Sequence, residues 1–155
     1  MLRTRWIAGP AAGHPGPLVA ALTDYRANRL LDLPGIARHG LSLSRLWPTL
    51  PGAVGMWLWA DLPGRRVGSL SVWREEDDLQ VFVRLREHVR IVREYRHRGV
   101  LRSRTWQVDG LDQVVPPGAG TCFADPHHGG DSQRSQPGYA ASVSCPAPRR
   151  TRERR

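Results

Sequence analysis

The segment of residues 67–98 constrains the fold of this chain more than any other. It begins with the apolar run VGSLSVW, continues through four consecutive acids, and ends in a stretch with apolar residues at helical spacing. The acids fit the first turn of a helix, because the positive end of a helix dipole favours negative charge. The spacing of the apolar residues predicts one long helix that ends before Gly99. We therefore expect a strand followed directly by a helix.

The chain upstream of this segment predicts the rest of a sheet. Residues 19–30 fit either a strand or a short helix, and we favour a strand. Asp32 and Pro34 are typical of a helix start, and that helix ends before Pro48. Residues 54–60 and 67–73 predict a hairpin around the turn DLPG, and residues 101–108 predict the last strand. This order of elements is the split β-α-β pattern of the ferredoxin-like α+β fold.

Composition divides the chain into three parts. Residues 1–19 are rich in Gly and Pro and predict an irregular lead-in, whereas residues 20–109 hold the ferredoxin-like domain. Residues 110–155 contain no periodic apolar run, so we expect a disordered tail. That tail includes Cys122, His127, His128 and Cys145, whose spacing fits no standard zinc pattern, and we expect no metal site.

The charge of the chain gives little support for a nucleic-acid partner. The formal net charge is +9, yet all 23 basic residues are Arg and none is Lys. Proteins selected for phosphate contact usually use both residues, so we attribute the Arg content to a GC-rich genome and expect no nucleic-acid partner. The apolar run from Leu18 to Leu22 is too short for a secretory signal or a membrane span. We expect a soluble cytoplasmic protein with no membrane partner.

Both faces of the predicted sheet carry large apolar side chains. Met56, Leu58 and Ala60 point one way from their strand, while Trp57 and Trp59 point the other way. Two helices cover only one face of a ferredoxin-like sheet. An open face with large apolar side chains usually needs a partner, so we expect a homodimer that joins the two open faces.

The segment GSLSVWREEDDLQVFVRLREHVRIVREYR, residues 68–96, resembles the second half of small monooxygenase-like domains of the dimeric α/β barrel superfamily. This superfamily includes antibiotic-biosynthesis monooxygenases, haem-degrading monooxygenases and proteins with a spheroidene-monooxygenase-like pattern. The matching features are a strand that ends in Ser-x-Trp, the acids after it, and Leu79, Phe82, His88 and Tyr95-Arg96. Residues 30–41 and 51–73 fit the same layout, so the resemblance covers residues 25–109.

The resemblance implies a domain that pairs with a second copy and binds a small molecule between its sheet and its helices. It implies an oxidoreductase of the monooxygenase type that acts on an aromatic or polyene molecule. The alternative is a non-catalytic ligand-binding or interaction module on the same scaffold. Some members of the superfamily use O₂ without a cofactor, and others bind haem through a histidine on the second helix. We expect no cofactor here, with haem as the alternative.

His88 is the candidate catalytic residue, because it lies at the border of the apolar stripe on the second helix. A neutral imidazole there can act as a general base or ligate haem iron, with Arg84 or Arg104 near the propionates. The alternative is a histidine that only packs. The candidate ligand-binding residues carry aromatic or cationic side chains: Trp57, Trp73, Tyr95, Trp106 and Arg84. Large aromatic residues also fill cores and interfaces without a ligand. His39, on the first helix, faces either the same pocket or solvent.

Overall fold

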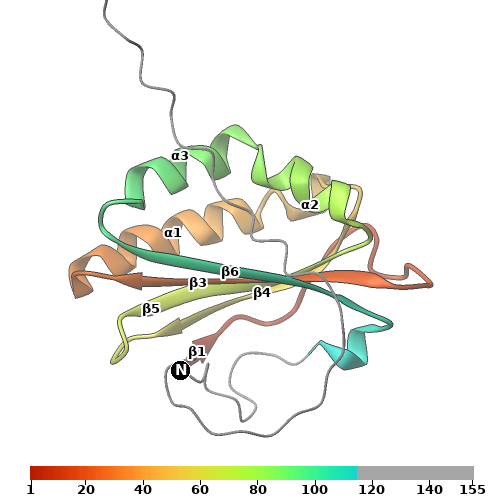
Figure 1. Ribbon diagram of the computed structural model, residues 1–155, viewed down its shortest axis with the longest axis horizontal. Coiled ribbons are helices and arrows are strands. Elements are labelled where there is room, and N and C mark those ends of the chain that lie inside the picture. Colours follow the sequence, from red (N-terminus) through yellow and green to blue (C-terminus); the bar gives the residue numbers. More distant parts are fainter. Residues whose placement is uncertain (115–155) are drawn as a thin grey trace, which may run out of the picture.

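The computed structural model describes residues 1–114, which form a sheet with helices on one side (Figure 1). The four long strands are β3 (Leu18–Ala27), β4 (Ala53–Asp61), β5 (Arg66–Trp73) and β6 (Gly99–Val108). They are antiparallel and lie in the order β4-β5-β3-β6. The helices are α1 (Leu33–Ser44), α2 (Glu76–Val83) and α3 (Arg86–Tyr95). The ferredoxin-like α+β prediction is therefore confirmed.

Short elements extend the packed part of the chain at both ends. In the segment predicted to be irregular, β1 (Leu2–Arg3) and β2 (Ile7–Ala8) pair antiparallel with β4. After β6, the short helix η3 (Leu111–Gln113) leads to Val114, whose side chain is buried. The two N-terminal strands extend the sheet beyond β4, with Trp6 packed on the face opposite the helices, and Val114 belongs to the buried cluster of that same face (Figure 1). The other short helices are η1 (Leu30–Asp32) and η2 (Trp47–Thr49), at the two ends of α1.

The single long helix predicted over residues 75–98 is wrong, because the structure has two helices there. Helix α2 ends at Val83, and Leu85 adopts an extended backbone with φ −56° and ψ 139° before α3 begins. The Leu85 side chain packs against the buried core, and the His88 ring satisfies the Val83 carbonyl that the break leaves free. Residues 75–98 contain no Gly or Pro, so the sequence carries no local signal for this break.

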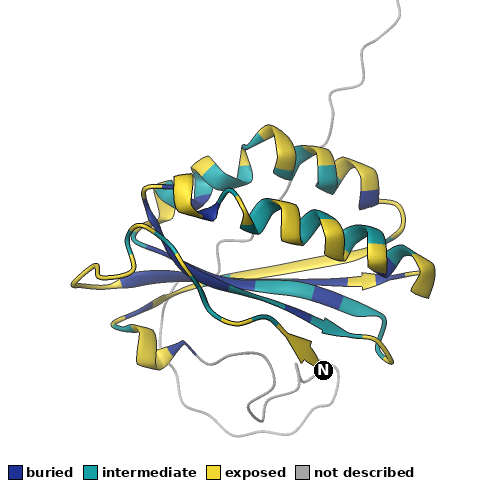
Figure 2. Ribbon diagram, turned by 180° about the vertical axis from the view of Figure 1, so that it is seen from behind, coloured by how far each residue is buried: buried dark blue, intermediate teal, exposed yellow. Residues whose placement is uncertain are grey.

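The sheet has an apolar layer on each face. The face toward the helices holds two buried clusters, one at each end of the sheet: Val19, Ala21, Trp47, Leu50, Ala53, Met56, Trp73 and Leu79, and then Tyr25, Ala27, Leu33, Val67 and Tyr95. We call the opposite face the outer face; its buried cluster is Leu18, Ala20, Val54, Leu70, Val72, Val108 and Val114. The helices expose their outward sides and bury the sides that face the sheet (Figure 2).

Strand β6 is the least covered of the long strands. Within residues 1–114 it forms one edge of the sheet, and its one partner there is β3, with which it pairs along its whole length. Seven of its ten residues are exposed, and they include residues from both faces of the strand. The helices therefore cover β5, β3 and β4 much more completely than they cover β6.

Candidate functional site

His88 lies on α3 and is half-buried against the ring of Phe82. Its Nδ1 atom lies 3.1 Å from the carbonyl oxygen of Val83, the last residue of α2. A carbonyl oxygen only accepts hydrogen bonds, so this contact requires a proton on Nδ1. In the neutral ring, Nε2 then carries the free lone pair, which can accept a proton or ligate a metal.

Burial of the ring lowers the pKa of His88, and the hydrogen bond to the Val83 carbonyl opposes this only in part. Desolvation disfavours the charged imidazolium, whereas a carbonyl that accepts from Nδ1 favours it. Because the net direction is downward, His88 is neutral at pH 7. The ring is therefore in the protonation state that a general base needs.

An aromatic wall extends from His88 into the core. We use this name for His88, Phe82, Trp73 and Trp47. The ring centroids of Phe82 and His88 are 5.0 Å apart, those of Trp73 and Phe82 are 5.1 Å apart, and those of Trp47 and Trp73 are 4.7 Å apart. Trp73 donates a hydrogen bond from Nε1 to Ser71 Oγ at 3.0 Å, which fixes the plane of its ring. The wall joins α3, α2, β5 and η2 at one end of the helix-covered face.

Two of the predicted ligand-binding residues lie on the other side of the sheet. Trp57 packs with Trp6 of the N-terminal segment at 4.4 Å between ring centroids, next to the outer-face cluster. Trp106 pairs in register with Ala20, which belongs to that same cluster. His88 and Trp73 lie on the helix-covered face, so the structure does not bring Trp57 or Trp106 together with them.

Tyr95 is also separate from His88, at the far end of α3. The two residues are seven positions apart on the helix, which is about 10 Å along the axis. Tyr95 is buried beside Tyr25, whose hydroxyl donates to the Tyr95 carbonyl oxygen at 3.1 Å. Burial raises the pKa of both phenols, which therefore stay neutral. His39 lies against the Tyr95 ring and 3.6 Å from a carboxylate oxygen of Glu94, so it links α1 to α3 and does not reach the aromatic wall.

The residues proposed to surround haem do not assemble as a set. The hydrogen bond from His88 Nδ1 to a backbone carbonyl fits an iron ligand, because such ligands need a partner on their second nitrogen. Arg104, however, pairs in register with Leu22, whose side chain packs on the outer face. Its side chain therefore leaves the sheet on the face opposite His88. Arg84 follows α2 directly and is exposed near the break between the helices.

Within residues 1–114 there is no cluster of three or more His, Cys, Asp or Glu side chains that would suit a metal ion. The predictions about Cys122, His127, His128 and Cys145 concern residues outside the described part of the chain. None of the described helices combines the length and the apolar character needed to cross a membrane.

Sequence reasoning missed an ion pair on the outer face. Asp24 of β3 is buried, and Arg66 of β5 contacts its carboxylate with two nitrogens, at 3.1 and 2.5 Å. The Arg66 guanidinium also lies 5.6 Å from the centre of the Trp59 ring. An acidic residue within an otherwise apolar strand indicates such an ion pair, because a buried charge needs a partner of opposite charge.

No protein-family model and no curated protein matches the chain. Solved structures do match. A "putative antibiotic biosynthesis monooxygenase" from Nitrosomonas europaea superimposes with a TM-score of 0.53 at 7% identity, over 64% of this chain and 96% of that one. A protein of unknown function from the same organism gives 0.51 at 16% identity, over 68% and 100%.

A "putative monooxygenase" from Lactobacillus acidophilus gives a TM-score of 0.50 at 10% identity and covers 59% of this chain. The chain spans only 47% of the length of that protein. At these identities the comparisons establish the fold alone. The described domain has the fold of antibiotic-biosynthesis-monooxygenase-like proteins, as the sequence resemblance implies.

Proposed function

We propose that this protein is a small monooxygenase-like enzyme that oxidises an aromatic or polyene molecule with O₂ and without a cofactor. The observation that carries the proposal is the state of His88. Its Nδ1 donates a hydrogen bond to the Val83 carbonyl oxygen, so Nε2 is the nitrogen that can accept a proton. Burial lowers the pKa of the ring. Phe82, which is half-buried beside the His88 ring, offers an apolar contact to a conjugated ligand, and the buried Trp73 packs behind it.

The proposed chemistry begins with the loss of a proton from the substrate to Nε2 of His88. The resulting anion is electron-rich and reacts with O₂, which is the oxidant. For a substrate with an acidic ring CH₂ group, the overall change is CH₂ plus O₂ to C=O plus H₂O. One oxygen atom enters the product and the other leaves as water. The substrate supplies all four electrons, so this reaction needs no separate reductant.

The alternative is a ligand-binding or interaction module with no catalytic activity. It is favoured by the absence, among residues 1–114, of any second polar group in contact with the His88 ring. In that case the protein binds a conjugated molecule beside Phe82, and His88 contributes only packing. Binding without O₂ consumption would support this alternative.

The test measures O₂ uptake with an anthrone, whose ring CH₂ is acidic, and follows ¹⁸O₂ into the product. We expect catalysis above the rate without protein, one labelled oxygen per product molecule, and a loss of about 100-fold or more in His88→Gln, as is typical of a general base. His97→Gln is the matched control, because His97 is exposed at the other end of α3. Equal rates in His88→Gln and the wild type would contradict the role of His88.

We also propose that the enzyme is a homodimer joined through its outer faces. Support comes from Trp106, which is 36% exposed, and from the half-buried Leu22 and Trp57 on the same face. The N-terminal segment and Val114 cover only part of this surface. A second copy offers the same apolar surface about a two-fold axis, which is the commonest arrangement in homo-oligomers.

A further inference from the structure

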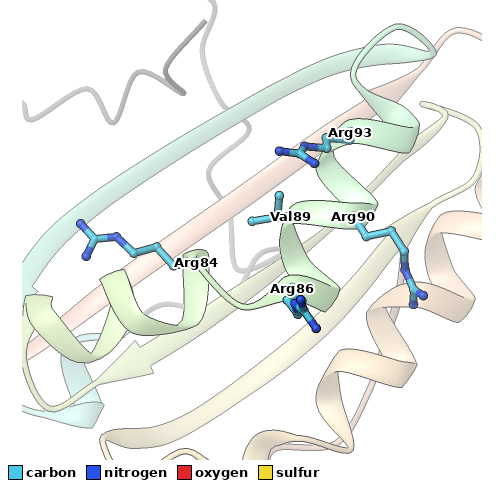
Figure 3. A pocket seen from close by; sticks show the side chains of 5 residues that line it. All are labelled: Arg84, Arg86, Val89, Arg90 and Arg93. Carbon is cyan, nitrogen blue, oxygen red and sulfur yellow. The ribbon is translucent and has the colours of Figure 1, made fainter. Parts of the chain in front are cut away.

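Helix α3 and the break before it carry an unusual concentration of arginine. Residues 84–98 contain six Arg and only two Glu. Four of these arginines and one apolar residue line a shallow hollow of about 420 Å³, which Figure 3 shows: Arg84, Arg86, Val89, Arg90 and Arg93. This volume lies within the range of small-molecule sites. We call this feature the arginine hollow.

The charges of the arginine hollow are not neutralised by the described part of the protein. Among residues 1–114, the side chains of Arg84, Arg86, Arg90 and Arg93 make no hydrogen bond or ion pair. Glu94 is the acid nearest to Arg93 in sequence, but its carboxylate lies 3.6 Å from Nε2 of His39 on α1. By contrast, Arg66, Arg74 and Arg98 all pair with carboxylates.

This arrangement costs stability in the absence of an anion. Arg86 and Arg90 are four residues apart on one helix, and like charges at this spacing repel each other. In Figure 3 the long side chains splay apart, with Arg84 and Arg93 extending to one side of α3 and Arg90 to the other. An anion bound in the hollow would offset part of this repulsion and give a partner to the guanidinium groups on its side of α3.

The start of α3 adds further donors at the same place. The residue before the helix is Leu85, whose side chain cannot cap the free amide groups of the first turn. Arg84 and Arg86 stand on either side of that residue. Free amides at a helix start favour phosphate groups, and arginine side chains bind phosphate with two parallel hydrogen bonds. The free amides and the arginine side chains therefore both favour a ligand that carries phosphate.

We propose that the arginine hollow binds the pyrophosphate group of a small phosphorylated molecule. Arg84 and Arg93 extend to the same side of α3 and offer two guanidinium groups to two linked phosphates, and Val89 offers an apolar contact to the rest of the ligand. Helix α3 has ten residues and is about 15 Å long, which suits a compact ligand better than the extended backbone of a nucleic acid. The proposal is independent of the oxygenase chemistry, since His88 packs inward against Phe82.

The test titrates inorganic pyrophosphate into the full-length protein at constant ionic strength, by calorimetry, with orthophosphate in a parallel arm. We expect saturable binding of pyrophosphate, and binding at least about tenfold weaker for orthophosphate, because fewer charge-assisted hydrogen bonds form. ADP and geranyl diphosphate then identify the kind of group attached to the pyrophosphate. Tighter binding of geranyl diphosphate would indicate an apolar group on Val89, and tighter binding of ADP would indicate a nucleoside.

Two double variants distinguish binding at the arginine hollow from binding to the overall positive charge of the protein. Arg90→Gln with Arg93→Gln should abolish saturable binding, whereas Arg38→Gln with Arg45→Gln should leave it unchanged. The second pair removes the same charge from exposed positions on α1 and at its end. Equal weakening in both double variants would overturn the proposal. So would binding of a DNA duplex that is much tighter than pyrophosphate binding and falls steeply with salt, because that would indicate a nucleic-acid surface.

Discussion

Ser71 has a role that its residue type alone does not suggest. Its hydroxyl is buried in the helix-covered face, accepts from Trp73 Nε1 at 3.0 Å and donates to the Ala21 carbonyl oxygen at 3.3 Å. It therefore satisfies the indole N–H of Trp73, one of the two tryptophans in the aromatic wall. A buried indole N–H without a partner would lose the hydrogen bond that it makes with water in the unfolded chain.

We predict that Ser71→Ala lowers the free energy of unfolding by about 1–3 kcal/mol, the usual cost of leaving a buried polar group unsatisfied. Urea denaturation followed by tryptophan fluorescence measures the change. Ser69→Ala is the matched control, because Ser69 lies two residues earlier on the same face of β5. It should change the free energy of unfolding by less than about 0.5 kcal/mol. Equal effects of the two substitutions would mean that the hydrogen bond to Trp73 contributes nothing.

The lowered pKa of His88 predicts a dependence of stability on pH. Since the ring has a lower pKa in the folded protein than its ordinary value of 6.5, the unfolded chain binds more protons as the pH falls below that value. Stability should therefore decrease on acidification from about pH 6.5, down to the folded pKa.

His88→Gln should remove part of this decrease, with His97→Gln as the matched control at an exposed position. Urea denaturation at a series of pH values, with an NMR titration of the imidazole, measures both effects. An imidazole that titrates at or above its ordinary pKa would contradict the burial of His88.

For single residues, the sequence predicted the position of His88 but not its hydrogen-bond partner. The apolar spacing of residues 81–92 placed His88 at the border of a buried stripe, and the structure leaves His88 half-buried, although Val81 of that predicted stripe is exposed. The Val83 carbonyl became available only because the helix breaks at Leu85, which periodicity cannot show. Trp57 and Trp106 were assigned to the pocket because they are aromatic. Residue type does not reveal which face of a sheet a side chain occupies once the strands are assembled.

The strands and α1 were predictable because their signals are local. Alternation in β4 and β5 separated the two faces correctly: Met56 and Leu58 pack toward the helices, and Leu70 and Val72 toward the outer face. Pro and Gly residues marked the ends of α1 and the hairpin. Strands β1 and β2 were not predictable, since two residues are too few to show alternation and their pairing with β4 depends on distant contacts.

The N-terminal segment is held to the outer face by Trp6. Its ring packs on Trp57 and over Gly55, where an added Cβ atom would lie only 1.9 Å from the ring. The absence of a side chain at Gly55 therefore makes room for Trp6. Main-chain hydrogen bonds from Thr4 to Leu58 and from Gly9 to Val54 fasten the segment on either side of this contact.

We predict that Trp6→Ala destabilises the protein by about 1–2 kcal/mol, less than the 3–5 kcal/mol of a fully buried Trp because Trp6 is half-exposed. Thermal or urea unfolding measures the loss. Leu2→Ala is the control within the same segment, since Leu2 in β1 is 63% exposed and should have almost no effect. If the two variants were equally stable, the N-terminal segment would not be part of the folded domain.

The described domain, residues 1–114, has one sheet with two differently covered faces. The helices bury Trp47 and Trp73 completely on one side, whereas within these residues the other side is covered by the N-terminal segment and by Val114. The proposed active site and the proposed dimer interface therefore lie on opposite faces, and the arginine hollow lies outside both. Substitutions at the interface should therefore change assembly, because the interface residues do not contact the aromatic wall.

Assembly through the outer face predicts a particle with twice the chain mass of 17.4 kDa in light scattering at micromolar concentration. Trp106→Arg should produce monomers, because it replaces an exposed apolar ring with a charge that would be desolvated in the interface. Leu41→Arg is the control: Leu41 is 49% exposed on α1, on the opposite side of the sheet, and its substitution should leave the dimer intact. A wild-type protein that is monomeric and fully stable would contradict the dimer, and dissociation by Leu41→Arg but not by Trp106→Arg would place the interface on the helices.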